Sequence, residues 1–407
     1  MSLRRVVVTG IGVISALGLK KEDFKSSIFS GRSGIEELTI PERSKLRFKK
    51  GGEVRGFAAK DHFDEKHLIL LERFSQFALV AAREAIGDAR FSWSSRSEKQ
   101  RTAVITGTGT GGQLNQDQSS IDLYKHEKTR LNPLIIPRAM SNAGASHISM
   151  ENGITGPTYT ITTACSSSNH AIGQAFWAVR SGLVDRAIAG GSETPFGFLN
   201  LKGWEAMRVV STDACRPFSK DRSGMILGEG GAMLFLESLE SAERRGAAIY
   251  AEIAGFAMSA DAHHITHPSA DGAAEAMEMA LDDARIEPEE IGYINAHGTA
   301  TVANDVMESK AIRKVFAGHS GKIAVSSTKS MHGHTLGAAG AIEAVATVLA
   351  LKDGILPPTI NFTEIDPECG LDIIQNTARK TQVEAAISNS FAFGGLNGAL
   401  VFRRWKD

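Results

Sequence analysis

Residues 160–168 read Thr160-Ile161-Thr162-Thr163-Ala164-Cys165-Ser166-Ser167-Ser168, and an apolar-periodic segment follows from Ala171 to Val179. The β-branched start, the small residues and the helical periodicity predict a strand, a tight turn and a helix. Cys165 would then lie at the N-terminus of that helix, where free backbone N–H groups and the helix dipole stabilise a thiolate. A lone cysteine is more often a small buried hydrophobe, so the prediction of a nucleophile depends on residues elsewhere in the chain.

Length and composition restrict the class of protein. The chain has 407 residues, of which 42% are hydrophobic, which is enough for a large core or for two similar domains. Its formal net charge of −1 argues against a nucleic-acid-binding protein. The cysteines Cys165, Cys215 and Cys369 are widely spaced, which argues against a disulfide framework or a structural zinc site and fits a reducing cytoplasm. No signal-peptide pattern and no apolar stretch of membrane-spanning length occurs, so we expect a cytoplasmic protein without membrane contact.

Apolar strands alternate with helical patterns, which predicts an α/β protein with mostly parallel strands. A strand at 159–163 with a helix to about residue 180 resembles a strand at 323–327 with a helix from 336 to about 352. Strands at 101–105 and 291–295 both end in Gly-rich loops. We therefore expect two homologous halves, residues 1–254 and 255–407, whose central helices point their N-termini toward one site. A chance likeness between two βα units is the alternative.

Two histidines occupy unusual positions in the second half. His297 directly follows a predicted strand, and His334 lies at a predicted helix start. A helix N-terminus disfavours the charged imidazole, so these side chains are expected to be neutral hydrogen-bond donors for a thioester carbonyl or an enolate oxygen. Lys329 lies nearby in a run of small polar residues. The tandem glycines of Phe391-Ala392-Phe393-Gly394-Gly395 permit unusual backbone angles, which can aim a backbone N–H and let an aromatic ring move.

Three other patterns indicate competing sites and are weaker. His263, His264 and His267 cluster, but no acidic or cysteine ligand has matching spacing for a metal site. Gly333–Gly337 has the outline of a nucleophile elbow with a threonine in the nucleophile position. Gly107-x-Gly109-x-x-Gly112 is an isolated dinucleotide fingerprint, and the residues after it do not open an apolar helix.

Several motifs together resemble one family over essentially the whole chain. They are Thr163-Ala164-Cys165-Ser166-Ser167, Ala189-Gly190-Gly191-Ser192-Glu193, Asn295-Ala296-His297-Gly298-Thr299, Ser327-Thr328-Lys329-Ser330-Met331, Gly333-His334, Leu336-Gly337-Ala338-Ala339-Gly340 and Asn389-Ser390-Phe391. In these the chain is similar to β-ketoacyl-acyl-carrier-protein synthases of the synthase II type, and within them to nodulation protein E-like synthases, with some likeness to type II polyketide ketosynthases. The resemblance implies a thiolase-like fold, with two duplicated βαβαβαββ halves in five αβαβα layers.

The resemblance also implies a mechanism, a decarboxylating Claisen condensation. Cys165 would take an acyl group from acyl carrier protein, with the backbone N–H groups of Cys165 and Phe393 as the oxyanion hole. His297 and His334 would promote decarboxylation of malonyl-carrier protein. The carbanion would then attack the acyl-cysteine, which gives 3-oxoacyl-carrier protein and CO₂. The condensation would serve fatty-acid or specialised acyl or polyketide chain elongation.

Further roles are implied by the same likeness. Thr299 and Thr301 would contact the pantetheine chain, Lys329 would pair with Glu308, and Phe393 would act as a gate. The remaining implied substrate-binding and supporting residues are Thr110, Phe391, Gly394 and Asp305. Carrier-protein docking would use Lys66, Arg130 and Arg208. No nicotinamide, ATP or catalytic metal is implied, although some relatives hold a structural Na⁺ or K⁺ ion at positions that match Asn295, Ala296, Glu343, Ser388 and Asn389. A homodimer is implied as well.

The chain departs from the common family pattern at several positions. Leu396 and His332 each replace a usual threonine, and Thr110 stands where isoleucine is frequent. Ile69 and Leu70 fall where basic docking residues are expected, and fewer basic contacts would weaken steering of an acidic carrier protein. We therefore expect a dedicated carrier protein or partner subunit.

Three other functions compete with the condensing enzyme. A degradative thiolase would need a second cysteine in the C-terminal Gly-rich loop, and residues 391–395 contain none. A non-catalytic chain-length-factor subunit would lack the nucleophile that Cys165 supplies. A dinucleotide-dependent oxidoreductase would depend on Gly107–Gly112 alone.

Overall fold

The computed structural model describes residues 3–406 and is built on an 11-stranded mixed sheet. The strand order is β12-β10-β9-β14-β15-β8-β1-β7-β6-β4-β5. The strands are β1 Val6–Ser15, β4 Thr102–Gly107, β5 Thr158–Ile161, β6 Arg186–Glu193, β7 Gly230–Ser238, β8 Ala251–Ala260, β9 Ile291–Asn295, β10 Ala324–Ser326, β12 Asp372–Ile373, β14 Ala385–Ala392 and β15 Leu396–Arg404.

Ten of the eleven strands form two copies of one topology, which confirms the predicted duplication, and β12 adds an edge strand to the second copy. The run β5-β4-β6-β7-β1 and the run β10-β9-β14-β15-β8 place corresponding strands in the same spatial order. The halves join where β1 pairs with β8, for example at Val6 and Ile253. The expected junction between residues 254 and 255 lies inside β8, so the second copy begins with that whole strand.

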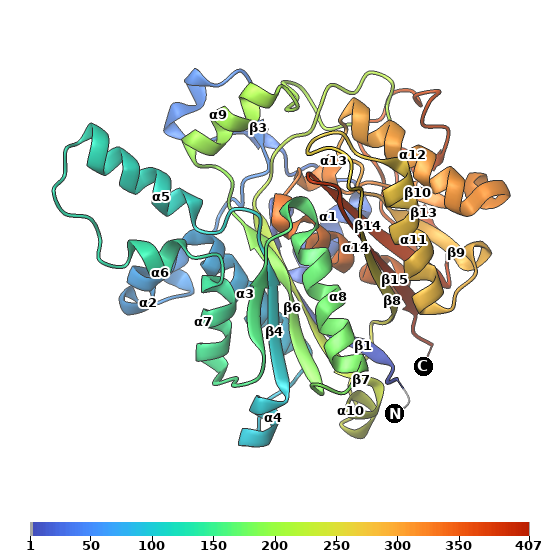
Figure 1. The fold of residues 1–407 in the computed structure, drawn as a ribbon, viewed down its shortest axis with the longest axis horizontal. Helices are drawn as coiled ribbons and strands as arrows, with labels where there is room; N and C mark the ends of the chain where they lie inside the picture. The colour runs from blue at the N-terminus through green and yellow to red at the C-terminus, as the bar shows by residue number, and fades with distance from the viewer. Residues whose placement is uncertain (1–2, 407) are drawn as a thin grey trace.

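Helices form three layers around the two halves of the sheet, which gives the predicted five-layer arrangement (Figure 1). The central layer is α8 and α14, each of which contacts strands of both halves. Helices α3 and α7 cover the outside of the first half, and α11 and α12 cover the outside of the second. These helices are α3 Arg73–Asp88, α7 Ala143–Asn152, α8 Ser167–Arg180, α11 Ala270–Ala284, α12 Val302–Phe316 and α14 Ala339–Asp353.

The expectation of mostly parallel strands is wrong. Strand β4 pairs in parallel with β5 and β6, and β9 does so with β10 and β14. However, β1–β7, β6–β7, β14–β15 and β8–β15 are antiparallel. The turn between β14 and β15 shows why: Gly394 and Gly395, with φ of 85° and 69°, close a tight hairpin, which only antiparallel strands can use.

The two central helices approach each other closely because their residues are small. A Cβ on Gly340 of α14 would lie 2.8 Å from the backbone nitrogen of Asn169 in α8, and a Cβ on Gly173 would meet the ring of Phe256 at 2.3 Å. Every residue of α14 from Ala339 to Leu351 is buried, as expected for a helix that is packed on all sides. This close packing brings the two helix N-termini to one place.

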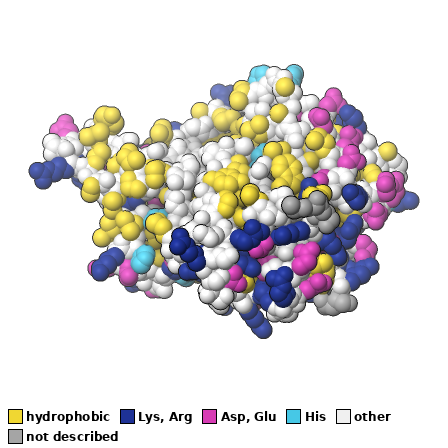
Figure 2. Space-filling view, turned by 60° about the horizontal axis from the view of Figure 1, so that its bottom comes forward, with side chains coloured by type: hydrophobic (Ala, Val, Ile, Leu, Met, Phe, Trp, Pro, Cys, Tyr) yellow, Lys and Arg dark blue, Asp and Glu magenta, His cyan; other side chains and the backbone are white. Residues whose placement is uncertain are grey.

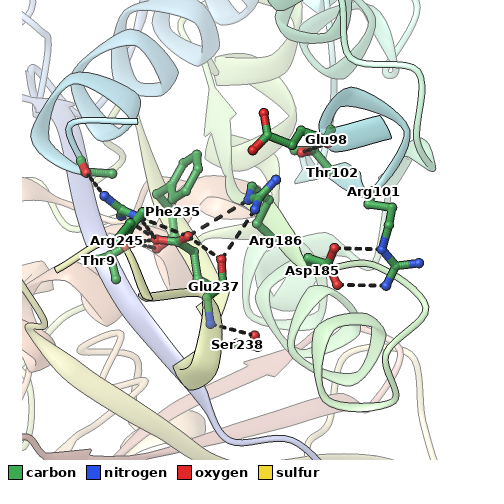
Figure 3. Close-up of polar contacts among 12 residues, drawn as sticks. Thr9, Glu98, Arg101, Thr102, Asp185, Arg186, Phe235, Glu237, Ser238 and Arg245 are labelled. Carbon is green, nitrogen blue, oxygen red and sulfur yellow. Dashed lines mark hydrogen bonds and ion pairs between the residues drawn. The ribbon is translucent and has the colours of Figure 1, made fainter. Parts of the chain in front are cut away.

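A buried ion cluster ties the strands together at the opposite end of β6 from the site (Figure 3). The Glu237 carboxylate accepts hydrogen bonds from Arg245 and, at 2.8 Å, from Thr9 Oγ1. Arg186 Nε lies 3.9 Å from Glu237 Oε1, and the Arg186 guanidinium stacks on the ring of Phe91 at 4.4 Å. The cluster thereby joins β1, β6 and β7 at their base.

Several helices lie outside the three layers. Helix α5 (Gln113–Ser120), the π-helical turn η3 (Ile121–Lys125) and α6 (Ile135–Ala139) form an arm that projects from the first half (Figure 1). The remaining α-helices are α1 (Lys21–Ser30), α2 (Glu65–Leu70), α4 (Arg96–Gln100), α9 (Phe198–Met207), α10 (Leu239–Arg244) and α13 (Lys329–His332). Within residues 3–406, none of the helices combines the length and apolar character needed to cross a membrane.

Candidate active site

The structure places Cys165 at the N-terminus of a central helix, as predicted. Cys165 lies in a short 3₁₀ turn, Ala164–Ser166, that leads directly into α8. Ala164 has a left-handed φ of 50°, so the chain turns sharply just before the thiol. Burial raises the pKa of Cys165 to about 12, and the Lys329 ammonium opposes that shift. The thiolate therefore depends on local donors and on the helix dipole for its stability.

His334 is the nearest of these donors. Its Nε2 atom lies 3.2 Å from Cys165 Sγ, and its Nδ1 atom accepts a hydrogen bond from Leu336 N at 3.3 Å. Because Nδ1 is an acceptor, the proton of the neutral ring is on Nε2 and faces the sulfur. Burial, followed by the charge of Lys329, lowers the pKa of His334 well below its ordinary value.

His297 lies beside His334 and lines the same cavity as Cys165. The His297 and His334 ring centroids are 5.4 Å apart at an interplanar angle of 85°. The Lys329 Nζ atom lies 3.4 Å from His297 Nδ1, and because an ammonium can only donate, the proton of the neutral His297 ring is on Nε2. Burial and then Lys329 lower the pKa of His297 well below its ordinary value. The site therefore holds two neutral imidazoles, each with an Nε2–H donor.

Lys329 does not pair with Glu308, which corrects the expectation from the sequence. Its ammonium forms an ion pair with Glu343 in the first turns of α14, and it donates to His297 O at 2.6 Å. Glu308 accepts instead from the backbone N–H groups of His297 and Gly298, each at 2.8 Å. Each Glu308 oxygen thus accepts from a backbone N–H group, and the counter-charge of Lys329 is the equally buried Glu343. Burial raises the pKa of Glu308 and of Glu343 to about 7 in each case.

Asp305 fixes the next part of the same loop. It accepts from Ala300 N at 3.2 Å and from Phe218 N at 2.8 Å, and Arg222 Nε lies 3.5 Å away. Burial raises the pKa of Asp305 to about 6. Glu308 and Asp305 are thus both placed to support the loop that carries His297, without reaching the thiol.

A cavity of about 120 Å³ opens beside these groups. Thr299 and Thr301 line it, as do Phe391 and Phe393. The loop that carries Phe393 is bonded to another segment of the cavity wall, because Gly394 N donates to the backbone oxygen of the lining residue Ile265 at 2.8 Å. The structure therefore brings the predicted nucleophile, both histidines, both threonines and the predicted gate to one cavity.

Thr110 has a different environment from the one predicted. Its hydroxyl donates to Glu193 Oε1 at 2.6 Å, and the described residues that line the cavity at Cys165 do not include it. The buried Glu193 also accepts from Gly109 N at 2.5 Å and Gly337 N at 3.0 Å. This carboxylate fills the Gly107–Gly112 loop, so the backbone N–H groups that a dinucleotide pyrophosphate would need are already used. Sequence reasoning missed this role of Glu193, whose only signal was its place in a family motif.

The three predicted docking residues lie exposed on separate segments. Lys66 is on α2, Arg130 precedes α6, and Arg208 ends α9 with a left-handed φ of 57°. Ile69 and Leu70 on α2 are 54% and 42% exposed. This part of the surface is therefore apolar where basic residues were expected.

The structure shows the surroundings of His332 and Leu396, the two residues near the site that each replace a usual family threonine. His332 is fully buried, with Nε2 3.1 Å from Thr328 Oγ1, and it does not line the cavity in the described part of the chain. Leu396 packs in the apolar cluster that contains Cys165.

The exposed histidine cluster does not form a metal site. No group of three or more His, Cys, Asp or Glu side chains in residues 3–406 is arranged to hold a metal ion. His264 Nδ1 lies 3.0 Å from His267 Nδ1, and both side chains line the mouth of the cavity, a placement that sequence reasoning missed.

Unpaired polar atoms gather at the positions expected for a monovalent cation. Across residues 3–406, the buried side-chain oxygens without a hydrogen-bond partner include Asn295 Oδ1, Glu343 Oε2, Ser388 Oγ and Asn389 Oδ1. Buried polar atoms are usually paired, so oxygens left over at adjacent positions fit a bound cation with oxygen ligands.

Comparison with known proteins agrees with this fold. The β-ketoacyl synthase N-terminal domain matches residues 3–242, and the β-ketoacyl synthase C-terminal domain matches residues 250–363. Nodulation protein E of Rhizobium sp. (strain N33) is 44% identical over 401 residues, which covers 98% of this chain and 99% of that protein. The 3-oxoacyl-[acyl-carrier-protein] synthase 2 of Synechocystis sp. is 42% identical over 412 residues, with 99% of each chain covered. The ishigamide ketosynthase/chain length factor structure aligns with a TM-score of 0.95, 36% identity and full coverage of both chains.

The duplicated halves, the central helix pair and the cysteine beside two histidines define a thiolase-like condensing enzyme. The chain belongs to the β-ketoacyl synthase family, and it is an acyltransferase of that type.

Proposed function

We propose that the protein joins an acyl group, held on Cys165, to malonyl-acyl carrier protein, with 3-oxoacyl-carrier protein and CO₂ as products. The observation that carries this proposal is the cysteine at the N-terminus of α8 with two neutral imidazole donors facing it. Two thioester steps on one thiol each need a place for a developing oxyanion, and Nε2–H donors in a buried site supply it.

In the first step the Cys165 sulfur attacks the carbonyl of the incoming acyl thioester. The new S–C bond replaces the bond to the carrier sulfur, which leaves as a thiol with the proton that Cys165 loses. The backbone N–H groups of Cys165 and Phe393 hold the oxyanion of this step. The helix dipole and the His334 Nε2–H stabilise the thiolate that attacks.

In the second step malonyl-carrier protein enters, with its pantetheine chain against Thr299 and Thr301. The bond to the carboxylate breaks, and the electron pair passes to the thioester enolate, whose oxygen accepts from His297 and His334. The enolate carbon then attacks the acyl carbonyl, and the Cys165 thiolate leaves. Lys329 keeps His297 neutral and oriented, and both carboxylates behind it, Glu308 and Asp305, fix the loop.

No redox cofactor or catalytic metal has a step in this scheme. A structural Na⁺ or K⁺ ion is part of the proposal, held by the side chains of Asn295, Glu343, Ser388 and Asn389 and by the Ala296 backbone. The ion would supply fixed positive charge that satisfies these oxygens. It would act by holding α14 and β14 in place near Lys329.

A homodimer is also part of the proposal. The projecting arm has exposed hydrophobic side chains, with Tyr124 81% and Ile136 68% exposed, and Figure 2 shows such side chains gathered on it. Strand β5 is an edge strand with open backbone groups. An apolar surface beside an open strand fits an interface between subunits.

The carrier protein is proposed to be a dedicated one, in a protein that acts in the cytoplasm. The exposed Ile69 and Leu70 support this, because an acidic housekeeping carrier would find fewer basic partners on α2. Equal turnover with a housekeeping carrier protein would contradict this part of the proposal.

The experiment that tests the function mixes the protein with acyl-carrier and malonyl-carrier proteins and follows CO₂ release and 3-oxoacyl product by mass. Product that requires both thioesters supports the proposal. Acyl exchange with no carbon–carbon bond formation would contradict it.

A further inference from the structure

One aromatic side chain of the cavity is not explained by the mechanism above. Trp204 of α9 stacks on Phe393, with ring centroids 6.0 Å apart and an interplanar angle of 23°. Both rings line the cavity that contains Cys165. Stacked aromatic pairs of this kind stabilise each other beyond their buried area, so Trp204 favours the observed position of Phe393.

The cavity has two chemically different walls. His297, Thr299 and Thr301 on one loop, with Asn304 at the start of α12, form a polar wall. Trp204, Val209 and Met225 belong to the same apolar cluster as Cys165, so they form a continuous apolar wall beside the thiol. An acyl chain on Cys165 would be placed against the apolar wall, since the polar wall offers hydrogen-bonding groups suited to pantetheine.

We propose that Trp204 determines the acyl-chain specificity of the enzyme. Its indole occupies the apolar wall and braces Phe393, so an acyl chain must fit between these rings and the thiol. A cavity of about 120 Å³ leaves little room beyond them. Long chains then require the stack to separate, whereas short chains do not. The inference rests on the proposed function, because it concerns the acyl group that Cys165 receives.

Trp204 lies at a position where it can be replaced without disturbing the core of the fold. Helix α9 lies outside the duplicated layers and ends at Met207. Trp204 is half-buried, so replacing it need not disturb the sheet or the central helices. Trp177 on α8 serves as a matched control, since it packs on Phe256 and is not a lining residue of the cavity in residues 3–406.

The test is competitive acylation of the full chain by an equimolar mixture of butyryl, octanoyl, dodecanoyl and hexadecanoyl pantetheine thioesters, read by intact mass. In Trp204→Ala we expect the ratio of dodecanoyl and hexadecanoyl adducts to butyryl adduct to rise about tenfold or more, because one or two methylenes in an apolar pocket discriminate by that amount. Trp204→Phe should lie between, and Trp177→Phe should match the wild type. An unchanged ratio in Trp204→Ala, with normal total acylation, would overturn the proposal.

Different results would contradict the role of Trp204 in specificity and the proposed condensation reaction. If Trp204→Ala fails to fold, Trp204→Phe and Trp204→Leu are compared, and equal chain profiles in all folded variants would overturn the inference. Wild-type protein that takes no acyl group from any thioester, while iodoacetamide still alkylates Cys165, would contradict the proposed function itself.

Discussion

His334 Nε2 lies 3.2 Å from the sulfur of Cys165, although 169 positions separate the two residues in the chain. The contact exists because α8 and α14 are equivalent helices of the two halves and meet at their N-termini. The turns that precede them match as well: Ala164 and Leu336 both have a left-handed φ, of 50° and 45°. Because the halves are duplicated, Cys165 lies at the N-terminus of α8 and its hydrogen-bond donor His334 lies just before the equivalent helix α14.

Replacing His334 should affect the condensation far more than replacing its neighbour His332. His334→Ala removes an Nε2–H donor aimed at the reacting atoms, so we expect the rate of product formation to fall by about 10²–10³-fold. His332→Thr should stay close to the wild-type rate, because this buried ring is outside the cavity. Single-turnover kinetics of the pre-acylated enzymes measure this. Equal losses in the two variants would argue against a donor role.

His332 should make the stability of the protein depend on pH. Burial lowers the pKa of His332 to about 3, so the folded state stays neutral where the unfolded state, with a pKa near 6.5, takes up a proton. The unfolded state therefore binds more protons below pH 6.5, and stability falls as the pH falls. Relative to His332→Thr, the wild type should lose about 1.4 kcal/mol between pH 7.5 and 5.5 in urea unfolding. A constant difference would contradict the buried neutral ring.

Replacing only one partner of the Lys329–Glu343 ion pair should lower the stability of the protein. Both side chains are fully buried, so Lys329→Met leaves an unpaired acid and should destabilise the protein by about 3–5 kcal/mol. The loss should shrink toward pH 5, because burial already raises the pKa of Glu343 and a protonated acid needs no partner. The double variant Lys329→Met with Glu343→Leu should recover much of the stability. Additive losses in the double variant would show that the two groups do not interact.

Monovalent cations should stabilise the fold if the unpaired oxygens near Glu343 hold one. We expect NaCl or KCl at ten times the dissociation constant to add about 1.4 kcal/mol over N-methylglucamine chloride at equal ionic strength. Ser388→Ala removes one of the unpaired oxygens and should weaken that increment. Identical unfolding curves in all three salts would contradict the binding of a cation at these oxygens.

Much of this arrangement could be predicted from the sequence, and the failures have physical causes. Cys165 and His297 follow strands in small-residue turns and His334 precedes a helix, which are local patterns, and the structure brings all three together. The partner of Lys329 could not be predicted, because spacing alone does not show which of two buried acids already accepts backbone N–H groups. The prediction of mostly parallel strands was wrong because a hairpin turn such as the one at Gly394 has the same sequence pattern as other glycine turns. Trp204 escaped notice because nothing in α9 shows that its indole meets Phe393.

The most direct test of the central claim is the intact mass of the protein after incubation with acyl-carrier proteins of several chain lengths, for the wild type and for Cys165→Ala. Cys215 and Cys369 are both buried, so a surface thiol is not expected to compete among the described residues. We expect a single acyl adduct on the wild type and none on the variant. An adduct that persists in Cys165→Ala, or no adduct on folded wild type with any carrier, would contradict the assignment of Cys165 as the nucleophile.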